Sequence, residues 1–241
     1  YDDNSEFKKK DLNKKKIFFT NNSKDIKDCN FYIICLPTPI NNQKIPDLKP
    51  LMSSIRILKN KLKKDDIIVL ESTVYPGLTK SFSNNLSKKT GLKNNQDYYT
   101  CYSPERINPG DKTKNLNKIE KIFALETSKK LVKLKVNSVY KLISKKLIFS
   151  KHIAEAETAK AIENTQRDLN IALFNELLIL SNKLNLKFNE VVRLASTKWN
   201  FLKFSPGLVG GHCLPVDPYY LSFISKKNNF KMNVALAGRS M

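Results

Sequence analysis

A glycine-rich loop before Cys213 contains the residues whose types and spacing could most directly do chemistry. Gly207, Gly210 and Gly211, three of the seven glycines in the chain, precede this cysteine. Glycine permits positive φ and a close approach of backbone to a ligand, so the loop could present a reactive thiol. The alternative is a Gly-Pro turn around an inert buried cysteine, a common fate of a free thiol. Taken alone the loop favours that turn, although Asp217 follows the thiol by four residues.

Polar side chains follow three successive apolar runs, which end at residues 36, 70 and 102. Ligands bind beyond the carboxyl ends of the strands in open α/β sheets, so chemistry is expected there. Ordinary turn chemistry explains any one of these ends. Three together, with an acid and a base adjacent at the last, favour a binding site. The residues are Pro37 with Thr38, Thr73, and Glu105 with Arg106.

A long helical pattern over residues 153–184, without Pro or Gly, brings further polar residues onto one face. Lys160, Asn164 and Arg167 recur at steps of three or four residues. A solvated, salt-bridged face is the ordinary explanation, but the small alanines around them suit close packing about a polar site. At about 1.5 Å per residue the helix spans about 45 Å, longer than a crossover needs, which predicts a second, all-helical unit.

The elements that must position these residues alternate between strands and helices. Apolar runs rich in β-branched and aromatic residues predict buried strands at 17–20, 31–36, 67–72, 97–102 and 147–149. Apolar residues at three- and four-residue spacing predict helices at 48–63, 79–89, 128–144 and 188–196. This alternation predicts an α/β fold with a parallel sheet covered by helices on both faces.

Composition limits the classes of function. The 43 basic and 22 acidic residues give a net charge of +21, which raises the alternative of a basic α/β module that binds nucleic acid. Only five of the basic residues are arginine, and scattered lysines are also typical of solvated faces. The four cysteines form no CxxC pair, so no metal site is expected. Without a signal peptide or an apolar run of about 18 residues, we expect a cytoplasmic protein with free thiols and no membrane partner.

Five motifs in order give the chain a family resemblance that covers nearly its whole length. They are CLPTPI, LESTVYPG, YSPERINPGD, AEAETAKAIENTQRDLNIALFNE and KWNFLKFSPGLVGGHCLPVDPYYL. Together they resemble the UDP-glucose/GDP-mannose dehydrogenase family, most closely the branch that acts on UDP-N-acetylhexosamines in bacterial surface polysaccharide synthesis. The resemblance implies a four-electron oxidation of the sugar C6 alcohol to a carboxylate, with two NAD reduced in turn at one site.

The resemblance also implies roles for the residues above. Cys213 would form a thiohemiacetal and then a thioester with C6, and Lys160 and Asn164 would donate to the oxygen that becomes charged. Asp217, Glu105 and Thr73 would serve the water that hydrolyses the thioester. The expected NAD contacts are Pro37, Thr38 and Thr73. The expected contacts with the nucleotide sugar are Glu105, Arg106, Lys160, Asn164, Arg167, Gly210 and Gly211.

The chain departs from the family pattern in two ways. It has no GxGxxG turn for the NAD pyrophosphate, and it stops before the family's second Rossmann-like domain. We therefore expect a fragment with an incomplete Rossmann-like parallel sheet at residues 1–150 and a long-helix, all-α central domain at 151–241. Such a chain should neither bind NAD tightly nor turn over alone. The long helix further predicts a homodimer, although its apolar stripe could equally be internal core.

Overall fold

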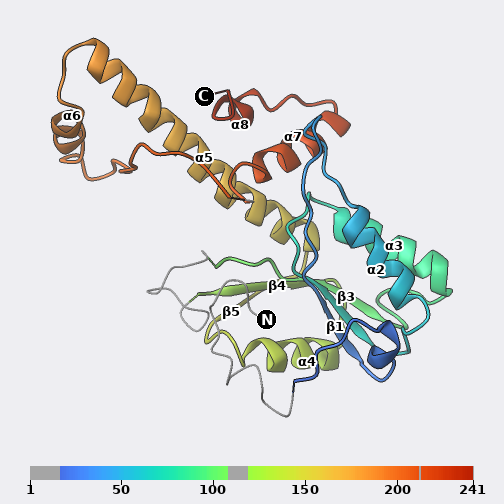
Figure 1. Cartoon of the computed structure of the whole chain (residues 1–241). Helices are drawn as coiled ribbons and strands as arrows, with labels where there is room; N and C mark the ends of the chain where they lie inside the picture. Colours follow the sequence, from blue (N-terminus) through green and yellow to red (C-terminus); the bar gives the residue numbers. More distant parts are fainter. Residues whose placement is uncertain (1–16, 108–118, 212, 241) are drawn as a thin grey trace.

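The computed structural model describes residues 17–107, 119–211 and 213–240, and part of the YSPERINPGD motif lies outside them. Five strands form one sheet in the order β1-β2-β3-β4-β5 (Figure 1). β1, β2 and β3 are parallel, β4 runs antiparallel to β3, and β5 is parallel to β4. The strands are β1 (Phe31–Ile34), β2 (Ile67–Leu70), β3 (Tyr99–Tyr102), β4 (Lys121–Leu125) and β5 (Leu147–Ser150).

The predicted α/β class is confirmed, but the sheet is mixed rather than wholly parallel. β4 was not predicted, because it is a five-residue run that begins with Lys121 and lies between polar segments. The predicted strand at 17–20 is wrong: these residues are not in a strand, and Phe18 and Phe19 are 77% and 70% exposed. Apolar composition alone cannot say whether a neighbouring strand is available for pairing.

Helices cover both faces of the sheet, as the alternation predicted. α2 (Lys49–Leu58) and α3 (Leu78–Thr90) lie on one face, and α4 (Lys130–Tyr140) lies on the other (Figure 1). Because successive side chains of a strand point to opposite faces, Ile68 packs in the core with α2 and α3, whereas Ile67 packs in the core with α4. A short 3-10 helix, η1 (Ser23–Ile26), precedes β1.

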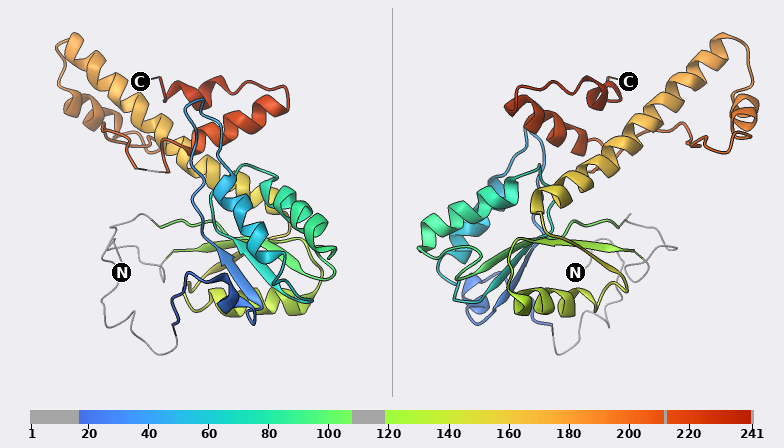
Figure 2. Two further views of the ribbon diagram at one scale, coloured as in Figure 1. Left: turned by 45° about the vertical axis from the view of Figure 1, so that its right-hand side comes forward. Right: turned by 180° about the vertical axis from the view of Figure 1, so that it is seen from behind.

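The long helix α5 (Ile153–Lys183) leaves the sheet and its far end projects from the rest of the molecule (Figure 2). α6 (Phe188–Ala195) lies near that far end, and α7 (Asp217–Lys227) packs against the part of α5 nearer the sheet (Figure 1). α8 (Asn233–Ala237) also contacts α5, and beside it Arg239 pairs with the fully buried Asp168. No helix in the described part of the chain is both long and apolar enough to cross a membrane.

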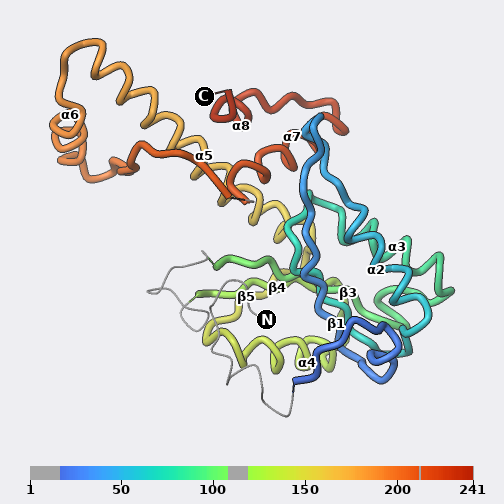
Figure 3. Tube along the Cα trace, viewed as in Figure 1, coloured from blue at the N-terminus to red at the C-terminus, as the bar shows by residue number. Residues whose placement is uncertain are grey.

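Two buried hydrogen-bonded joints connect the sheet to the helical part. Glu157 of α5 is fully buried and accepts the backbone N–H groups of Gly77 at 2.5 Å and Thr79 at 2.8 Å. These groups belong to the first turn of α3, whose N–H groups lack partners within the helix. In the second joint, the hydroxyl of Tyr220 on α7 donates to the backbone oxygen of Thr38. Figure 3 shows how the segment after β1 rises from the sheet to reach α7.

Candidate active site

The carboxyl ends of β1, β2 and β3 and the start of α7 surround a cavity of about 460 Å³. It is lined by residues from three strand ends and by the loop before α7, which lie far apart in the sequence. Five residues that the sequence predicted for the site are among the lining residues, and so is Pro37 from the predicted cofactor contacts. These five are Thr38, Thr73, Glu105, Cys213 and Asp217.

Asp217, the first residue of α7, is the best-buried acid of this cavity, with 1% of its surface exposed. Burial raises its pKa from 3.8 to about 6, while a hydrogen bond from Asn164 and the charge of Lys160 act to lower it. The amide nitrogen of Asn164 donates to the Oδ2 atom at 2.5 Å. The predicted helix face therefore meets the predicted acid, and a carboxyl group with this pKa can take up or release a proton near neutral pH.

Cys213 is exposed, so the buried position considered as an alternative is wrong for this residue. Its backbone oxygen accepts the N–H groups of Val216 and Asp217, both at 3.0 Å, in the turn that begins α7. Asn175 of α5 holds the start of the loop, because its amide exchanges two hydrogen bonds with the backbone of Gly207, at 2.8 and 3.0 Å. Hydrogen bonds therefore hold the loop at Gly207 and at the turn that begins α7. Between these points Gly211 has a φ of +81°.

The loops after β1 and β2 are connected to each other by hydroxyl groups. The Oγ1 atom of Thr38 donates to the backbone oxygen of Thr73 at 2.6 Å, and the Oγ atom of Ser72 donates to that of Leu36 at 2.6 Å. These bonds leave the lone pairs of the Thr38 hydroxyl available to accept a bond from a ligand. This wall of the cavity is neutral, in contrast to the acidic wall formed by Glu71 and Glu105.

Glu105 lines the cavity and has 45% of its side chain exposed. Its Oε1 atom accepts the backbone N–H groups of Arg106 at 2.6 Å and Ile107 at 2.7 Å. Its Oε2 atom lies 3.6 Å from the ammonium group of Lys121. Sequence reasoning missed Lys121 because it missed β4, and it missed Glu71 although that residue directly follows β2 and lines the cavity.

Several predicted substrate contacts are not among the lining residues of the cavity. Arg106 pairs with Glu163 of α5 at 2.8 Å and donates to the backbone oxygen of Glu120 at 2.9 Å. Arg167 is exposed on α5, and Gly210 and Gly211 are exposed in the loop before Cys213. Lys160 is 8% exposed and acts on Asp217 through its charge. The sequence placed these residues on suitable elements, but spacing could not identify their partners.

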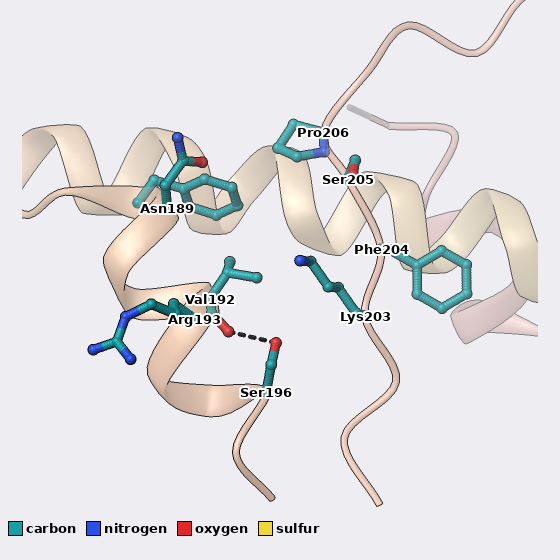
Figure 4. A pocket seen from close by; sticks show the side chains of 9 residues that line it. Asn189, Val192, Arg193, Ser196, Lys203, Phe204, Ser205 and Pro206 are labelled. Atoms are coloured by element: carbon teal, nitrogen blue, oxygen red, sulfur yellow. Dashed lines mark hydrogen bonds between the residues drawn. The ribbon is translucent and has the colours of Figure 1, made fainter.

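A second pocket of about 440 Å³ lies beside α6, away from these residues (Figure 4). Val192 and Arg193 of α6 line one side and Lys203, Phe204 and Pro206 line the other. The Oγ atom of Ser196 donates to the backbone oxygen of Val192 at 2.6 Å, so this hydroxyl group supports the helix end. Within the described residues no group of three or more His, Cys, Asp or Glu side chains could hold a metal ion.

A sheet with a cavity at its carboxyl edge, completed by a cysteine loop beside a long helix, has the architecture of a Rossmann-type α/β unit joined to a helical unit. The family model for the NAD binding domain of the UDP-glucose/GDP-mannose dehydrogenase family matches residues 2–144. The model for the central domain of the same family matches residues 154–241. The chain therefore belongs to the UDP-glucose/GDP-mannose dehydrogenase family.

Curated relatives are similar over most of this chain. The UDP-N-acetyl-D-glucosamine 6-dehydrogenase of Salmonella typhi is 50% identical over 225 residues, covering 92% of this chain and 52% of the relative. Protein CapL of Staphylococcus aureus is 43% identical over 240 residues, covering 99% of this chain and 56% of that protein. The chain spans about half the length of the curated relatives it matches.

Solved structures agree with this family. The UDP-D-ManNAc dehydrogenase of Pyrococcus horikoshii matches with a TM-score of 0.83 at 32% identity, covering 92% of this chain and 52% of that one. The UDP-N-acetyl-mannosamine dehydrogenase Cap5O of S. aureus matches with a TM-score of 0.73 at 31% identity, covering 88% of this chain and 50% of that one. The fold of the sheet and of the helical unit is therefore that of the family.

Proposed function

We propose that this chain supplies the catalytic thiol and its partners to an NAD-dependent nucleotide-sugar 6-dehydrogenase. The reaction oxidises the C6 alcohol of a UDP-N-acetylhexosamine to a carboxylate. The observation that carries the proposal is that Cys213 and Asp217 share one cavity with Thr38, Thr73 and Glu105. The similarity to UDP-N-acetyl-D-glucosamine 6-dehydrogenases supports the class of substrate.

Cys213 retains the substrate between two oxidations in this proposal. The thiolate adds to the C6 aldehyde, forming a carbon–sulfur bond while the carbonyl oxygen takes up a proton, which gives a thiohemiacetal. Loss of a hydride and a proton converts it to a thioester, and water then releases the acid and the thiol. NAD, when bound, accepts the hydride in each oxidation. The exposed thiol on an anchored loop supports this role.

Lys160 and Asn164 stabilise the negative charge that develops on the C6 oxygen. One N–H of the Asn164 amide is bonded to Asp217, which leaves its second N–H for the substrate. Lys160 lies one helical turn earlier on the same face and is nearly buried, so its charge acts where little water screens it. Both groups are on α5, a rigid element that also packs against α7.

Asp217 and Glu105 activate the water that hydrolyses the thioester, and Thr73 positions it. With a pKa of about 6, Asp217 is mostly ionised at neutral pH and can accept a proton from water. Glu105 uses its Oε1 atom for two backbone N–H groups, while its Oε2 atom can accept from water. Two carboxyl groups at one cavity suit a step in which a proton must leave the attacking water.

The neutral wall of the cavity fits the nicotinamide end of NAD. Pro37, Thr38 and Thr73 line it with apolar surface and hydroxyl oxygens, and lie at the carboxyl ends of parallel strands where dinucleotides bind. Arg106, Arg167 and the backbone of Gly210 and Gly211 serve the nucleotide sugar.

The arrangement of domains and subunits is part of the same proposal. Residues 1–150 act as the NAD-binding part and residues 151–241 as the central helical part. A homodimer forms through α5, whose far half exposes leucines such as Leu173 and Leu180. The enzyme works in the cytoplasm and supplies sugar acids for surface polysaccharide synthesis.

The test uses the natural full-length protein that carries this sequence, incubated with a panel of UDP-N-acetylhexosamines and UDP-hexoses. We expect two NADH for each UDP-N-acetylhexosamine consumed, and a sugar acid as the product. Cys213→Ser should lower formation of the acid by at least about a thousandfold, because the covalent route is lost. A Cys35→Ser variant is the matched control, since Cys35 also lines the cavity. Undiminished acid formation by Cys213→Ser would overturn the thioester route.

A further inference from the structure

A buried lysine lies behind the acidic wall of the cavity, where no role has yet been assigned. Lys121 opens β4 and is 3% exposed. Its ammonium nitrogen has no hydrogen-bond partner within the described residues. Burial of an ammonium group is costly unless nearby charges offset the lost hydration, so its surroundings must supply those charges.

Two carboxylates from neighbouring strand ends face this ammonium group. The Nζ atom lies 3.3 Å from the Oε2 atom of Glu71, which follows β2, and 3.6 Å from the Oε2 atom of Glu105, which follows β3. The ring centroid of Tyr140 lies 5.6 Å from the same nitrogen, and the hydroxyl of Tyr140 donates to the Oε1 atom of Glu71 at 2.5 Å. Glu71 is thus held from two sides by α4 and β4.

Glu105 is more exposed than Glu71, although its Oε1 atom accepts the backbone N–H groups of Arg106 and Ile107. Glu71 has 12% of its side chain exposed, compared with 45% for Glu105. Both carboxylates line the cavity, so without a cation between them two like charges would face each other in a partly desolvated space. The more exposed Glu105 would then turn toward solvent, where water replaces the hydrogen bonds that its Oε1 atom accepts from Arg106 and Ile107.

We propose that Lys121 is the positioning residue that keeps the Glu105 carboxylate in the cavity beside Glu71. This inference rests on the proposed function, in which Glu105 helps to activate the hydrolytic water. Lys121 touches neither substrate nor cofactor and acts through Glu105. Its loss should therefore impair hydrolysis of the thioester more than the binding of the nucleotide sugar.

Lys121→Met tests the inference, because methionine keeps most of the volume and removes the charge. In the full-length protein we expect kcat to fall at least about tenfold, with the Kd for the UDP-N-acetylhexosamine changed less than about twofold. The thioester at Cys213 should accumulate, which mass spectrometry of the quenched enzyme measures. Lys121→Arg should restore most of the rate. Lys146→Met is the control, because Lys146 is an exposed lysine paired with Glu120.

A double variant separates positioning from a merely structural role. Lys121→Met combined with Glu71→Gln removes the like charge that repels Glu105, so the double variant should be faster than Lys121→Met alone. An unchanged kcat in Lys121→Met, or a double variant slower than Lys121→Met, would overturn the inference.

A crystal structure of Lys121→Met gives a readout that does not depend on turnover. We expect the Glu105 carboxylate to have turned out of the cavity. If it keeps its place, the inference is wrong whether or not the protein oxidises nucleotide sugars. If it moves but the unmodified protein oxidises no nucleotide sugar, the positioning role holds and the proposed function fails.

Discussion

The two halves of α5 have opposite patterns of burial. In the inner half, residues 153–168, the buried side chains include the charged groups of Glu157 and Lys160. In the outer half, residues 169–183, Leu173, Leu177 and Leu180 are 49%, 38% and 50% exposed. Burial of charge costs free energy unless specific partners satisfy it, so the inner half is built around contacts with other elements. The outer half instead leaves apolar side chains exposed.

The largest effect is expected where the inner half joins the sheet. Glu157→Ala leaves the N–H groups of Gly77 and Thr79 without their acceptor and opens a cavity. The free energy of unfolding should fall by about 3–4 kcal/mol. Urea denaturation followed by circular dichroism measures it.

Glu155→Ala is the matched control for that variant, because Glu155 lies on the same helix but is exposed. It should change the free energy of unfolding by less than about 0.5 kcal/mol. Equal losses of unfolding free energy in the two variants would show that the buried Glu157 contributes no more to stability than an exposed glutamate of the same helix.

The next effect depends on pH and concerns Asp217. Its folded pKa of about 6 lies above the ordinary 3.8, so between these values the folded protein binds more protons than the unfolded chain. The stability contributed by the protonated group is present below about pH 4 and is lost as the pH rises through about 6, by up to about 3 kcal/mol. The measurement is the difference in the free energy of unfolding between the parent and Asp217→Asn, obtained by urea denaturation at pH 4 and again at pH 7.

Asn keeps the shape of the Asp217 side chain but does not titrate, so the variant should gain stability relative to the parent as the pH rises. If the difference in unfolding free energy between parent and variant stays constant from pH 4 to pH 7, the raised pKa of a buried Asp217 is contradicted. The opposite sign would mean that the pKa is lowered, as in an ordinary ion pair.

The smallest effect on folding is expected in the outer half. Leu180→Ser should change the unfolding free energy of the subunit by less than about 0.5 kcal/mol, because half of the leucine surface is already exposed. If the outer half forms the proposed homodimer, Leu180→Ser should raise the dissociation constant of the dimer at least about tenfold, as measured by analytical ultracentrifugation. Glu176→Ser, at another exposed position of this half, is the control. Dimerisation unchanged by Leu180→Ser would exclude this face as the interface.

Much of the candidate site followed from the sequence because two simple rules apply to it. The carboxyl ends of parallel strands meet at one edge, so Thr38, Thr73 and Glu105 were expected together, and they line one cavity. Helical spacing put Lys160 and Asn164 on one face of α5, and both act on Asp217. These relations are local or depend only on topology, which a sequence pattern reports well.

Contacts that depend on the packing of side chains did not follow from the sequence. β4 is short and begins with a charged residue, so periodicity missed it, and with it the ammonium group of Lys121. Arg106 also pairs with Glu163, a partner 57 residues away that no spacing rule identifies. No prediction was made for Glu157, which is fully buried at the first turn of α3.

The most direct test of the account is to look for the covalent intermediate on Cys213. In the full-length protein, Glu105→Gln should slow hydrolysis of the thioester while leaving the thiol free to react. After incubation with NAD and a UDP-N-acetylhexosamine, acid quench and proteolysis, mass spectrometry should find the sugar acid attached to the peptide that contains Cys213. An unmodified Cys213 peptide in a variant that still forms the acid would contradict the account.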